Sequence, residues 1–442
     1  MSREAFSPHT AGSQPAATDY GDIAGIVAPG FDGGVLLVAP HFWPSAAVGA
    51  KRFVFLAREF SKAGFPVRAL TFRPGAGEAT DRSLPCSGAA HPVASVLPPI
   101  GRLRRFVPLA LQTPDRFVGW WPSSIFGGWR LIRRAPPAVI IATGPPFTAF
   151  LTGACLRRLS GAKLILDYRD PWTGFDWTGT KHARTRGSNS LNRKLERWAV
   201  SRADALVFAT EAMRAHFVER IPVPADTPGH VLTNGFDDAR SVAPRALSTD
   251  RKNIVYAGTL YGQRRISDLT DALHVLREEA GAEWSPPAIH VFGIVTAEDR
   301  ERVAEKGMTH LLHEHQRVDH AVILGYLKAA DVLYLPTGGS THYSYDIPYK
   351  LFDYLSVRRP VLAFGPRDSE VASFMRAADC GVMAYTDEPG SLPGALAQLL
   401  GGDRQHAFTG VERYTWNAIG AEYLRLVARV VSEPENAERR GG

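Results

Sequence analysis

Short apolar runs alternate with longer amphipathic segments along most of the chain. Residues 35–39 are continuously apolar, as in a strand buried on both faces, and residues 50–57 carry apolar side chains at the spacing of a helix. Gly64 follows as a helix C-cap, and residues 67–72 return to a strand pattern. The alternation predicts parallel β-sheets whose strands are joined by right-handed helical crossovers.

The alternation falls into two series separated by a polar break. The first series continues with predicted strands at 138–143, 163–168 and 205–209 and predicted helices at 148–159, 191–202 and 211–220. The second has strands at 254–257, 289–293, 332–336 and 361–365 and helices at 266–278 and 349–356. Residues 237–250 lack either pattern and are predicted to be an interdomain linker. Two such series predict two Rossmann-like domains that face a cleft and bind ligands beyond the carboxyl ends of their strands.

The chain of 442 residues is long enough for two or three domains. We expect a flexible tail at 1–33, an N-terminal domain at 34–240 and a C-terminal domain at 251–410. An apolar stripe predicts a helix within 411–432, which either crosses back to the first domain or docks on its own. Residues 433–442 are expected to form a second flexible tail.

Composition narrows the class of protein. Hydrophobic residues make up 45% of the chain and charged residues 21%, which is ordinary for a globular protein. No apolar run is long enough for a membrane-spanning helix and the N-terminus lacks a signal-peptide core, so we expect a cytoplasmic protein. Cys86, Cys155 and Cys380 are far apart, without the spacing of a zinc site, and are expected to be reduced. A net charge of +7 suits anionic partners or is simply a basic surface.

The first strand–turn–helix of the second series carries candidate phosphate-binding residues. The predicted strand ends at Gly258 and Thr259, where backbone N–H groups and the following helix dipole could face a phosphate. Arg264 and Arg265 follow, and a guanidinium group pairs well with diphosphate oxygens. A plain turn with solvated arginines is the alternative interpretation.

A second candidate segment is SYDIPYKLFDYL, residues 344–355. Pro348 suits the first turn of a helix, and Lys350 would lie in that turn, where a cation opposes the helix dipole unless an anion lies between them. Asp353 follows on the same face and could accept hydrogen bonds from ribose hydroxyls. The alternative is a surface ion pair between Lys350 and Asp353.

The order of these segments resembles glycosyltransferase family four, the retaining GT-B enzymes of bacterial polysaccharide synthesis. The matching pieces are HFWPSAAVGAKRFVFLAREFSKAGFPVRALT, PPAVIIATGPPFTAFL, LILDYRDPW, VLTNGFDD, IVYAGTLYGQRR and KAADVLYLPTGGSTHYSYDIPYKLFDYLSVRRPVLAFG. They lie within residues 35–430. The resemblance implies a transferase of the hexosyltransferase type that takes a nucleotide-diphosphate sugar as co-substrate and needs neither a bound metal nor another cofactor.

The resemblance also implies roles for individual residues of the second domain. The residues that would bind the donor diphosphate are Gly258, Thr259, Arg264 and Arg265. Pro348 and Lys350 belong to a Pro-x-Lys variant of the donor motif. Asp353 takes the place of the family glutamate that binds ribose and is one methylene shorter. Tyr345 stands where the family often has a second acidic residue.

Candidate acceptor residues lie in the first domain. Gly49 resembles the glycine-containing loop that follows the first strand, where small residues let substrates approach the backbone; a simple helix start is the alternative. Asp170 ends a predicted strand and could orient or deprotonate an acceptor hydroxyl, or it could cap its loop and pair with Arg169. Trp172 is also predicted to contact the acceptor. We assign no covalent nucleophile, because the departing diphosphate can accept the proton.

Residues 100–134 combine seven arginines with a single acid, Asp115. The aromatic residues among them are Phe106, Phe117, Trp120, Trp121, Phe126 and Trp129. Either the aromatic residues anchor an excursion onto the first domain, or the segment faces an anionic membrane or a lipid-linked acceptor. Nucleic acid is not expected as a partner. His313 and His315 mimic a metal-binding pair, but no third ligand is evident and a solvent-facing strand explains them.

The sequence thus predicts an α/β protein of the GT-B type, with two Rossmann-like domains facing a cleft. We expect it to move a sugar from a nucleotide-diphosphate sugar to a saccharide or lipid-linked acceptor, with retention, in cell-surface polysaccharide or glycolipid synthesis. Peripheral contact with the inner face of the cell membrane would run through residues 100–134. The alternatives are a nucleotide-sugar epimerase on the same fold and a catalytically degenerate module for assembly or membrane docking.

Overall fold

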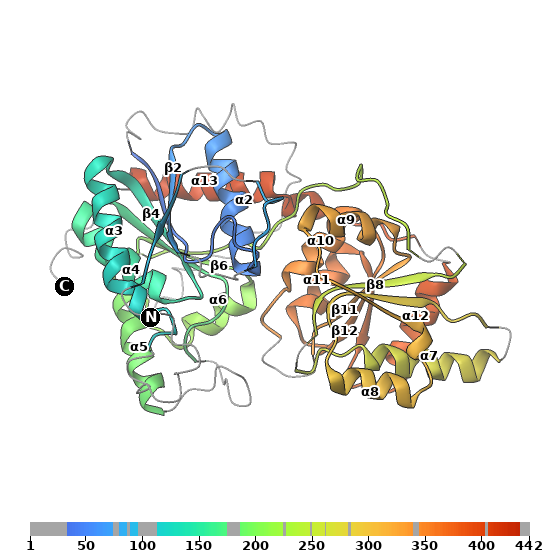
Figure 1. Ribbon diagram of the computed structural model, residues 1–442. Coiled ribbons are helices and arrows are strands. Elements are labelled where there is room, and N and C mark those ends of the chain that lie inside the picture. Colours follow the sequence, from blue (N-terminus) through green and yellow to red (C-terminus); the bar gives the residue numbers. More distant parts are fainter. Residues whose placement is uncertain are drawn as a thin grey trace. The chain divides into compact units, whose positions relative to one another are not determined.

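The computed structural model describes residues 33–73, 79–85, 89–95, 113–174, 186–223, 227–247, 250–260, 262–281, 284–338, 344–402 and 405–433 (Figure 1). Two compact units make up the chain: one runs to Asn234 and resumes at Trp416, and the other is Gly235–Thr415. Almost all of the two expected tails, residues 100–112 of the basic and aromatic segment, and Cys86 lie outside the described residues.

The first unit is built on a parallel seven-stranded sheet with the order β3-β2-β1-β4-β5-β6-β7. Its strands are β1 (Gly34–Val38), β2 (Val67–Phe72), β3 (Ala89–Val93), β4 (Pro137–Gly144), β5 (Lys163–Tyr168), β6 (Ala205–Phe208) and β7 (Gly229–Val231). Its helices are α2 (Val48–Lys62), α3 (Trp121–Arg134), α4 (Thr148–Ser160), α5 (Arg186–Val200), α6 (Glu211–Val218) and α13 (Trp416–Ser432). The strand order reverses between β1 and β4, which is where parallel sheets of this kind bind ligands.

Apolar strands and helices on both faces form the core of this unit (Figure 1). In β1 and β4 nearly every side chain is buried, which is why the sequence shows continuous apolar runs there instead of alternation. Leu36 and Ile140 pack with residues of α3, α4 and α5 on one face of the sheet. On the other face α2 packs against α13, where the rings of Phe55 and Trp416 stack at 5.2 Å. The last helix therefore crosses back to the first unit.

The second unit is a parallel six-stranded sheet with the order β10-β9-β8-β11-β12-β13. Its strands are β8 (Asn253–Thr259), β9 (Ala288–Ile294), β10 (Leu312–His315), β11 (Val332–Pro336), β12 (Val361–Gly365) and β13 (Gly381–Tyr385). Its helices are α7 (Ser267–Ala280), α8 (Ala297–Glu305), α9 (His320–Ala329), α10 (Tyr349–Val357), α11 (Glu370–Ala378) and α12 (Ser391–Gly401). Here the order reverses between β8 and β11. The predicted α/β class with two Rossmann-like units is confirmed.

The expected linker at 237–250 is corrected by the structure, since it packs within the second unit. Phe236 and Ala239 are buried in that unit's core. The Ala239 N–H donates to the Ser356 carbonyl at 3.0 Å, and the Arg245 N–H donates to the Gly325 carbonyl at 3.0 Å. These backbone bonds go to helices and loops instead of a sheet ladder, so the segment has no period that the sequence could reveal. The chain crosses between the units at residues 234/235 and 415/416.

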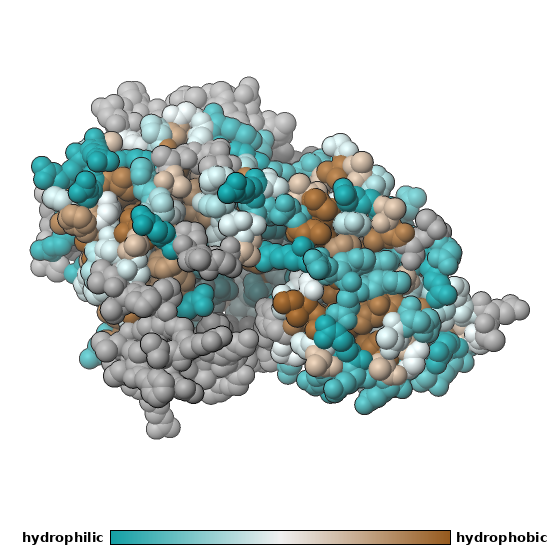
Figure 2. Space-filling model, viewed as in Figure 1, coloured by the Kyte–Doolittle hydropathy of each residue, from teal (hydrophilic) through white to brown (hydrophobic). Residues whose placement is uncertain are grey.

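On the face drawn in Figure 2, hydrophobic and hydrophilic residues are interspersed over both units, as is ordinary for a globular protein. Across the described ranges, none of the helices combines the length and apolar character needed to cross a membrane.

The two histidines of β10 join a third histidine on the neighbouring strand. His290 of β9 stacks on His313 at 4.8 Å, and its Nδ1 lies 3.0 Å from Nε2 of His315. Its Nε2 lies 3.1 Å from Oδ1 of Asn253, whose amide Nδ2 donates to the Arg251 carbonyl, so that His290 Nε2 is the donor. Burial, and then the charges of His313 and His315, lower the pKa of His290 to about 4. Within the part of the chain that the structure describes, no three His, Cys, Asp or Glu residues are placed to hold a metal ion.

Acid is therefore expected to destabilise this protein below pH 6.5. His290 titrates at about pH 4 in the folded protein but near pH 6.5 when unfolded, so between these values the unfolded chain binds more protons and stability falls as pH falls. The shift corresponds to a loss of about 3 kcal/mol from His290 by pH 4. Urea unfolding at pH 7, 5.5 and 4 measures it. The His290→Gln variant should lose this part of the pH dependence, whereas the exposed His310→Gln should keep it.

Candidate functional site

Tyr354 fixes α10 beneath the strand reversal of the second unit. Its hydroxyl donates to the Tyr334 carbonyl of β11 at 3.1 Å and accepts from the Ala257 N–H of β8 at 3.2 Å. The side chain is fully buried, and burial raises the pKa of Tyr354, so that the hydroxyl stays neutral and serves as both donor and acceptor. The first turn of α10 is thereby held at the carboxyl ends of the two central strands.

Lys350 lies one turn before Tyr354 on the same face of α10 and reaches the end of β8. Its Nζ donates to the Tyr256 hydroxyl at 2.6 Å and lies 4.1 Å from the centre of the Tyr256 ring. Gly258 has φ +134°, and a Cβ there would lie 2.8 Å from Nζ of Lys350, so only glycine suits this position. Two of the predicted donor residues, Gly258 and Lys350, therefore lie side by side at the end of β8.

The ammonium group of Lys350 is in an unusual electrostatic position for the first turn of a helix. Among the residues placed by the structure, no carboxylate forms an ion pair with it, and Pro348 at the N-cap of α10 provides no side-chain cap. Burial, and then the positive charge of Arg264, lower the pKa of Lys350 to about 7, while Asp353 acts in the opposite direction. Pro348 lies just before the first turn, not inside it, because the helix begins at Tyr349. An anion at this place would restore the charged form of Lys350.

The other predicted donor residues lie around the same strand end. Arg264 is buried, with its Nη2 4.0 Å from Oδ2 of Asp346 in the segment that precedes α10. Arg265 is partly exposed and pairs with Glu298 at 3.4 Å. Thr259 is exposed at the end of β8, and Tyr345 is partly exposed in the turn before α10. Arg264 thus comes close to Lys350, and Arg265 turns to α8.

The N-terminus of α7 departs from the sequence interpretation. Asp299 of α8 accepts hydrogen bonds from the Ile266 N–H at 3.2 Å and the Ser267 N–H at 3.1 Å. The backbone donors that were expected to face a phosphate at this helix are therefore occupied by a carboxylate of the chain itself. In this unit the uncapped N-terminus beside a cation is that of α10, which carries Lys350.

Asp353 is turned toward α9. Its Oδ1 accepts a hydrogen bond from Nε2 of His320, the first residue of α9, at 2.8 Å. The expected alternative, an ion pair between Lys350 and Asp353, does not form, since Lys350 bonds to Tyr256 instead. His320 was not singled out in the sequence, because its partner lies 33 residues away and no local pattern marks it.

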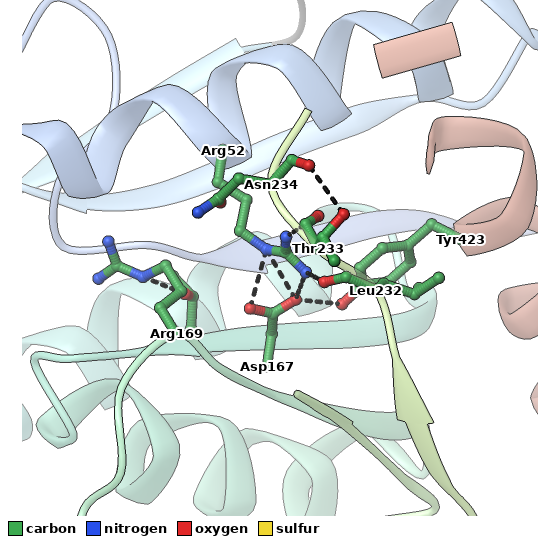
Figure 3. Close-up of polar contacts among 8 residues, drawn as sticks. Arg52, Asp167, Arg169, Leu232, Thr233, Asn234 and Tyr423 are labelled. Carbon is green, nitrogen blue, oxygen red and sulfur yellow. Dashed lines mark hydrogen bonds and ion pairs between the residues drawn. The ribbon is translucent and has the colours of Figure 1, made fainter. Parts of the chain in front are cut away.

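In the first unit, Gly49 meets Arg169 at the strand reversal, and Figure 3 shows the side chain of Arg169. Gly49 lies in the first turn of α2, and a Cβ there would overlap the guanidinium group of Arg169. Arg169 donates from Nε to Oγ1 of Thr143 at 3.0 Å and from Nη2 to the Pro145 carbonyl, at the end of β4. No side chain caps α2 at Ala47. The absence of a side chain at Gly49 therefore lets Arg169 approach the first turn of α2.

Two further predicted acceptor residues lie nearby in the sequence and differ in exposure. Asp170 is partly exposed, and its charge raises the pKa of Arg169 against the larger effect of burial, which lowers it. Trp172 is fully buried, stacks on Phe147 at 5.0 Å and donates from Nε1 to Oδ1 of Asn192 at 2.7 Å. Trp172 therefore has no exposed surface for an acceptor and belongs to the core, which corrects the prediction.

A buried ion pair that the sequence analysis missed underlies this region (Figure 3). Arg52 of α2 donates to Asp167 of β5 from Nε at 3.1 Å and from Nη2 at 2.9 Å, and both side chains are buried. Its Nη1 and Nη2 also donate to the Thr233 and Leu232 carbonyls at 2.6 and 2.8 Å. The Tyr423 hydroxyl of α13 donates to Oδ2 of Asp167 at 3.1 Å. One signal was available: a carboxylate near the end of a continuously apolar strand needs a buried partner.

Comparison with known proteins gives a domain match over part of the chain and a set of similar folds. Residues 49–235 match the family model of the glycosyl transferase 4-like domain. Among curated proteins, none matches this sequence. The solved sucrose-phosphate synthase of Thermosynechococcus elongatus superposes with a TM-score of 0.65, at 15% identity over 89% of this chain and 98% of that chain. The match to the UDP-forming α,α-trehalose-phosphate synthase of Burkholderia vietnamiensis has a TM-score of 0.57, at 12% identity over 90% and 98%.

A third solved structure, HepE of Anabaena in complex with UDP and glucose, has a TM-score of 0.56, at 13% identity over 90% of this chain and 97% of that chain. The two units of this chain therefore have the GT-B fold. Over residues 49–235 the chain is similar to glycosyl transferase 4-like domains. The resemblance drawn from the sequence segments is confirmed by the domain match at residues 49–235 and by the fold of both units.

Proposed function

We propose that this protein is a glycosyltransferase that takes a nucleotide-diphosphate sugar as donor and transfers the sugar, with retention, to a saccharide or lipid-linked acceptor in cell-surface polysaccharide or glycolipid synthesis. The observation that carries the proposal is Lys350, a cation without an ion-pair partner among the described residues, placed at the uncapped start of α10 and against Gly258. The similarity to HepE, whose structure holds UDP and glucose, supports a nucleotide-sugar donor.

The proposed chemistry in the second unit is electrostatic. Negative charge builds up on the diphosphate as it leaves the sugar, and Lys350 with Arg264 would stabilise that charge at the end of β8. Arg265 and Thr259 would complete the diphosphate contacts from the same turn. Asp353, oriented by His320, would accept a hydrogen bond from a ribose hydroxyl.

In the first unit, Asp170 would orient the acceptor hydroxyl beside Arg169 and Gly49. The proposal includes no covalent protein nucleophile and no bound metal. The departing diphosphate would accept the proton of the acceptor hydroxyl, which suits transfer on the face that the leaving group has vacated. Retention is measured by NMR of the anomeric proton of the product, and a product of opposite anomeric configuration to the donor would contradict it.

Calorimetric titration with UDP-, GDP-, ADP- and dTDP-sugars tests the donor site. We expect one of them to bind in the micromolar to millimolar range, and Gly258→Ala to weaken it by more than about tenfold because the new Cβ strains the backbone and displaces Lys350. Gly281→Ala is the matched control, since Gly281 also has positive φ in this unit but has no atom within 4 Å of an added Cβ. If no nucleotide sugar binds at millimolar concentration, the proposal fails.

A further inference from the structure

The inner face of α3 is fixed on the first unit by small and polar contacts. Gly128 lies against Leu156 of α4, where an added Cβ would come within 2.5 Å of its Cδ1. The Ser124 hydroxyl lies 2.7 Å from the Thr152 hydroxyl of α4, and Leu131 is buried in the core. These contacts determine the rotation of α3 about its axis, and therefore which of its side chains face solvent.

The outer face of α3 carries aromatic and cationic side chains in alternation. Phe126 is 58% exposed, and its ring stacks with the Trp129 ring at 5.9 Å. The Arg130 guanidinium lies 5.8 Å from the centre of the Phe126 ring, and that of Arg133 lies 5.1 Å from the Trp129 ring. We call these four residues the α3 ladder. Their spacing of three, four and seven residues puts them on one stripe of the helix.

The charge of this stripe is of one sign. The helix ends with Arg133 and Arg134 and has no acidic residue in its sequence WPSSIFGGWRLIRR. Two other arginines of the unit lie in ion pairs: Arg214 pairs with Glu211 at 2.5 Å, and Arg425 pairs with Glu422 at 2.5 Å. An exposed aromatic pair flanked by arginines without neighbouring carboxylates on the helix is not the mixed-charge pattern of an ordinary solvated face.

We propose that the α3 ladder docks the protein on an anionic lipid surface. Aromatic rings favour the interface between headgroups and acyl chains, and arginines can each take a lipid phosphate in the same plane. An extended anionic surface matches the row of cations along the helix, and the exposed Phe126 gives the apolar contact that charge attraction alone lacks. The inference is independent of the donor site, and it would bring a lipid-linked acceptor to the first unit.

Vesicle co-sedimentation tests the ladder. The wild-type protein should bind phosphatidylcholine vesicles containing 30% phosphatidylglycerol and should not bind pure phosphatidylcholine. Arg130→Gln with Arg133→Gln should reduce the partition coefficient about 25-fold, since each basic residue near an anionic membrane contributes about fivefold. Phe126→Ser should lower the partition coefficient by a similar factor at low and high salt, because its contribution is apolar and is not screened.

The matched control is Arg214→Gln with Arg425→Gln, which removes two partly exposed arginines of the same unit that lie on other helices. It should leave vesicle binding within about twofold. Circular dichroism and nucleotide-sugar binding should be unchanged in all variants, so that a loss at the membrane is separable from a loss of folding or of donor binding. Equal binding to neutral vesicles, or an equal effect of the control, would overturn the proposal. So would a wild-type dimer that the ladder variants dissociate, since a second copy would then cover the face.

Discussion

An Asp167→Ala variant is expected to lose about 3–5 kcal/mol of its free energy of unfolding, because Arg52 would keep its charge in a buried site without its partner. The loss of stability should exceed that caused by an ordinary cavity of this size. The reason is that the Asp167 carboxylate also accepts a hydrogen bond from the Tyr423 hydroxyl, which would lose its partner. Urea unfolding followed by the near-ultraviolet signal measures it.

The Asp167→Ala variant should also increase the mobility of the chain next to residues 234/235 and 415/416, where it passes from one unit to the other. Arg52 holds the Leu232 and Thr233 carbonyls just before the first crossing, and Tyr423 lies in the helix that follows the second. Limited proteolysis near residues 232–234 should therefore become faster in Asp167→Ala. Glu211→Ala is the control, because it breaks an exposed ion pair with Arg214 and should cost less than about 1 kcal/mol. An equal loss in the two variants would show that the buried pair does not stabilise the unit.

Much of the fold could be predicted because strands buried on both faces of a sheet are rich in consecutive apolar residues, which the local sequence shows. The strands at Val67–Phe72, Lys163–Tyr168, Val332–Pro336 and Val361–Gly365 have the bounds that the sequence predicts. Such strands can be predicted without knowledge of the neighbouring strand, since most of their residues are buried whichever strand lies beside them. The edge strand Ala89–Val93 was missed for the opposite reason: its sequence AAHPV lacks a continuous apolar run.

The parts that the sequence could not predict depend on partners far along the chain. Arg52 and Asp167 are separated by 115 residues, and no local sequence pattern around either residue indicates that the two form a pair. Asp299 occupies the start of α7 from the next helix, so a helix N-terminus that looks available in the sequence is closed in the structure. Trp172 follows a polar strand end, and only tertiary packing determines that its ring turns inward against Phe147.

Lys350 differs from these residues, because its unfavourable position relative to the helix dipole can be recognised from the local sequence. A lysine in the first turn of a helix opposes the dipole whatever lies elsewhere, so the sequence alone could mark it as a candidate site. The structure adds what the sequence lacked, namely the contact with Tyr256, the fit against Gly258 and the lowered pKa.

Replacement of Lys350 by methionine is expected to weaken nucleotide-sugar binding about 100-fold, since a hydrogen bond to a charged group contributes up to about 3 kcal/mol. We expect kcat to fall by a further factor of about 10–100, because the charge that develops on the leaving diphosphate would lose a nearby cation. Calorimetry and product formation measure the two effects. Lys306→Met is the control, because Lys306 is an exposed lysine of the same unit that pairs with Asp271.

The pH dependence of donor binding separates a contact of Lys350 with the diphosphate from a merely structural role. With a pKa of about 7 in the free protein, Lys350 is half protonated at neutral pH, and only its protonated form attracts the anion. The dissociation constant should therefore rise about tenfold per pH unit above 7, and binding should take up a proton, which titrations in buffers of different ionisation enthalpy detect. Lys350→Arg keeps its charge and should bind with an affinity that is flat between pH 7 and 9. If the slope persists in Lys350→Arg, another group titrates and the diphosphate does not rely on Lys350.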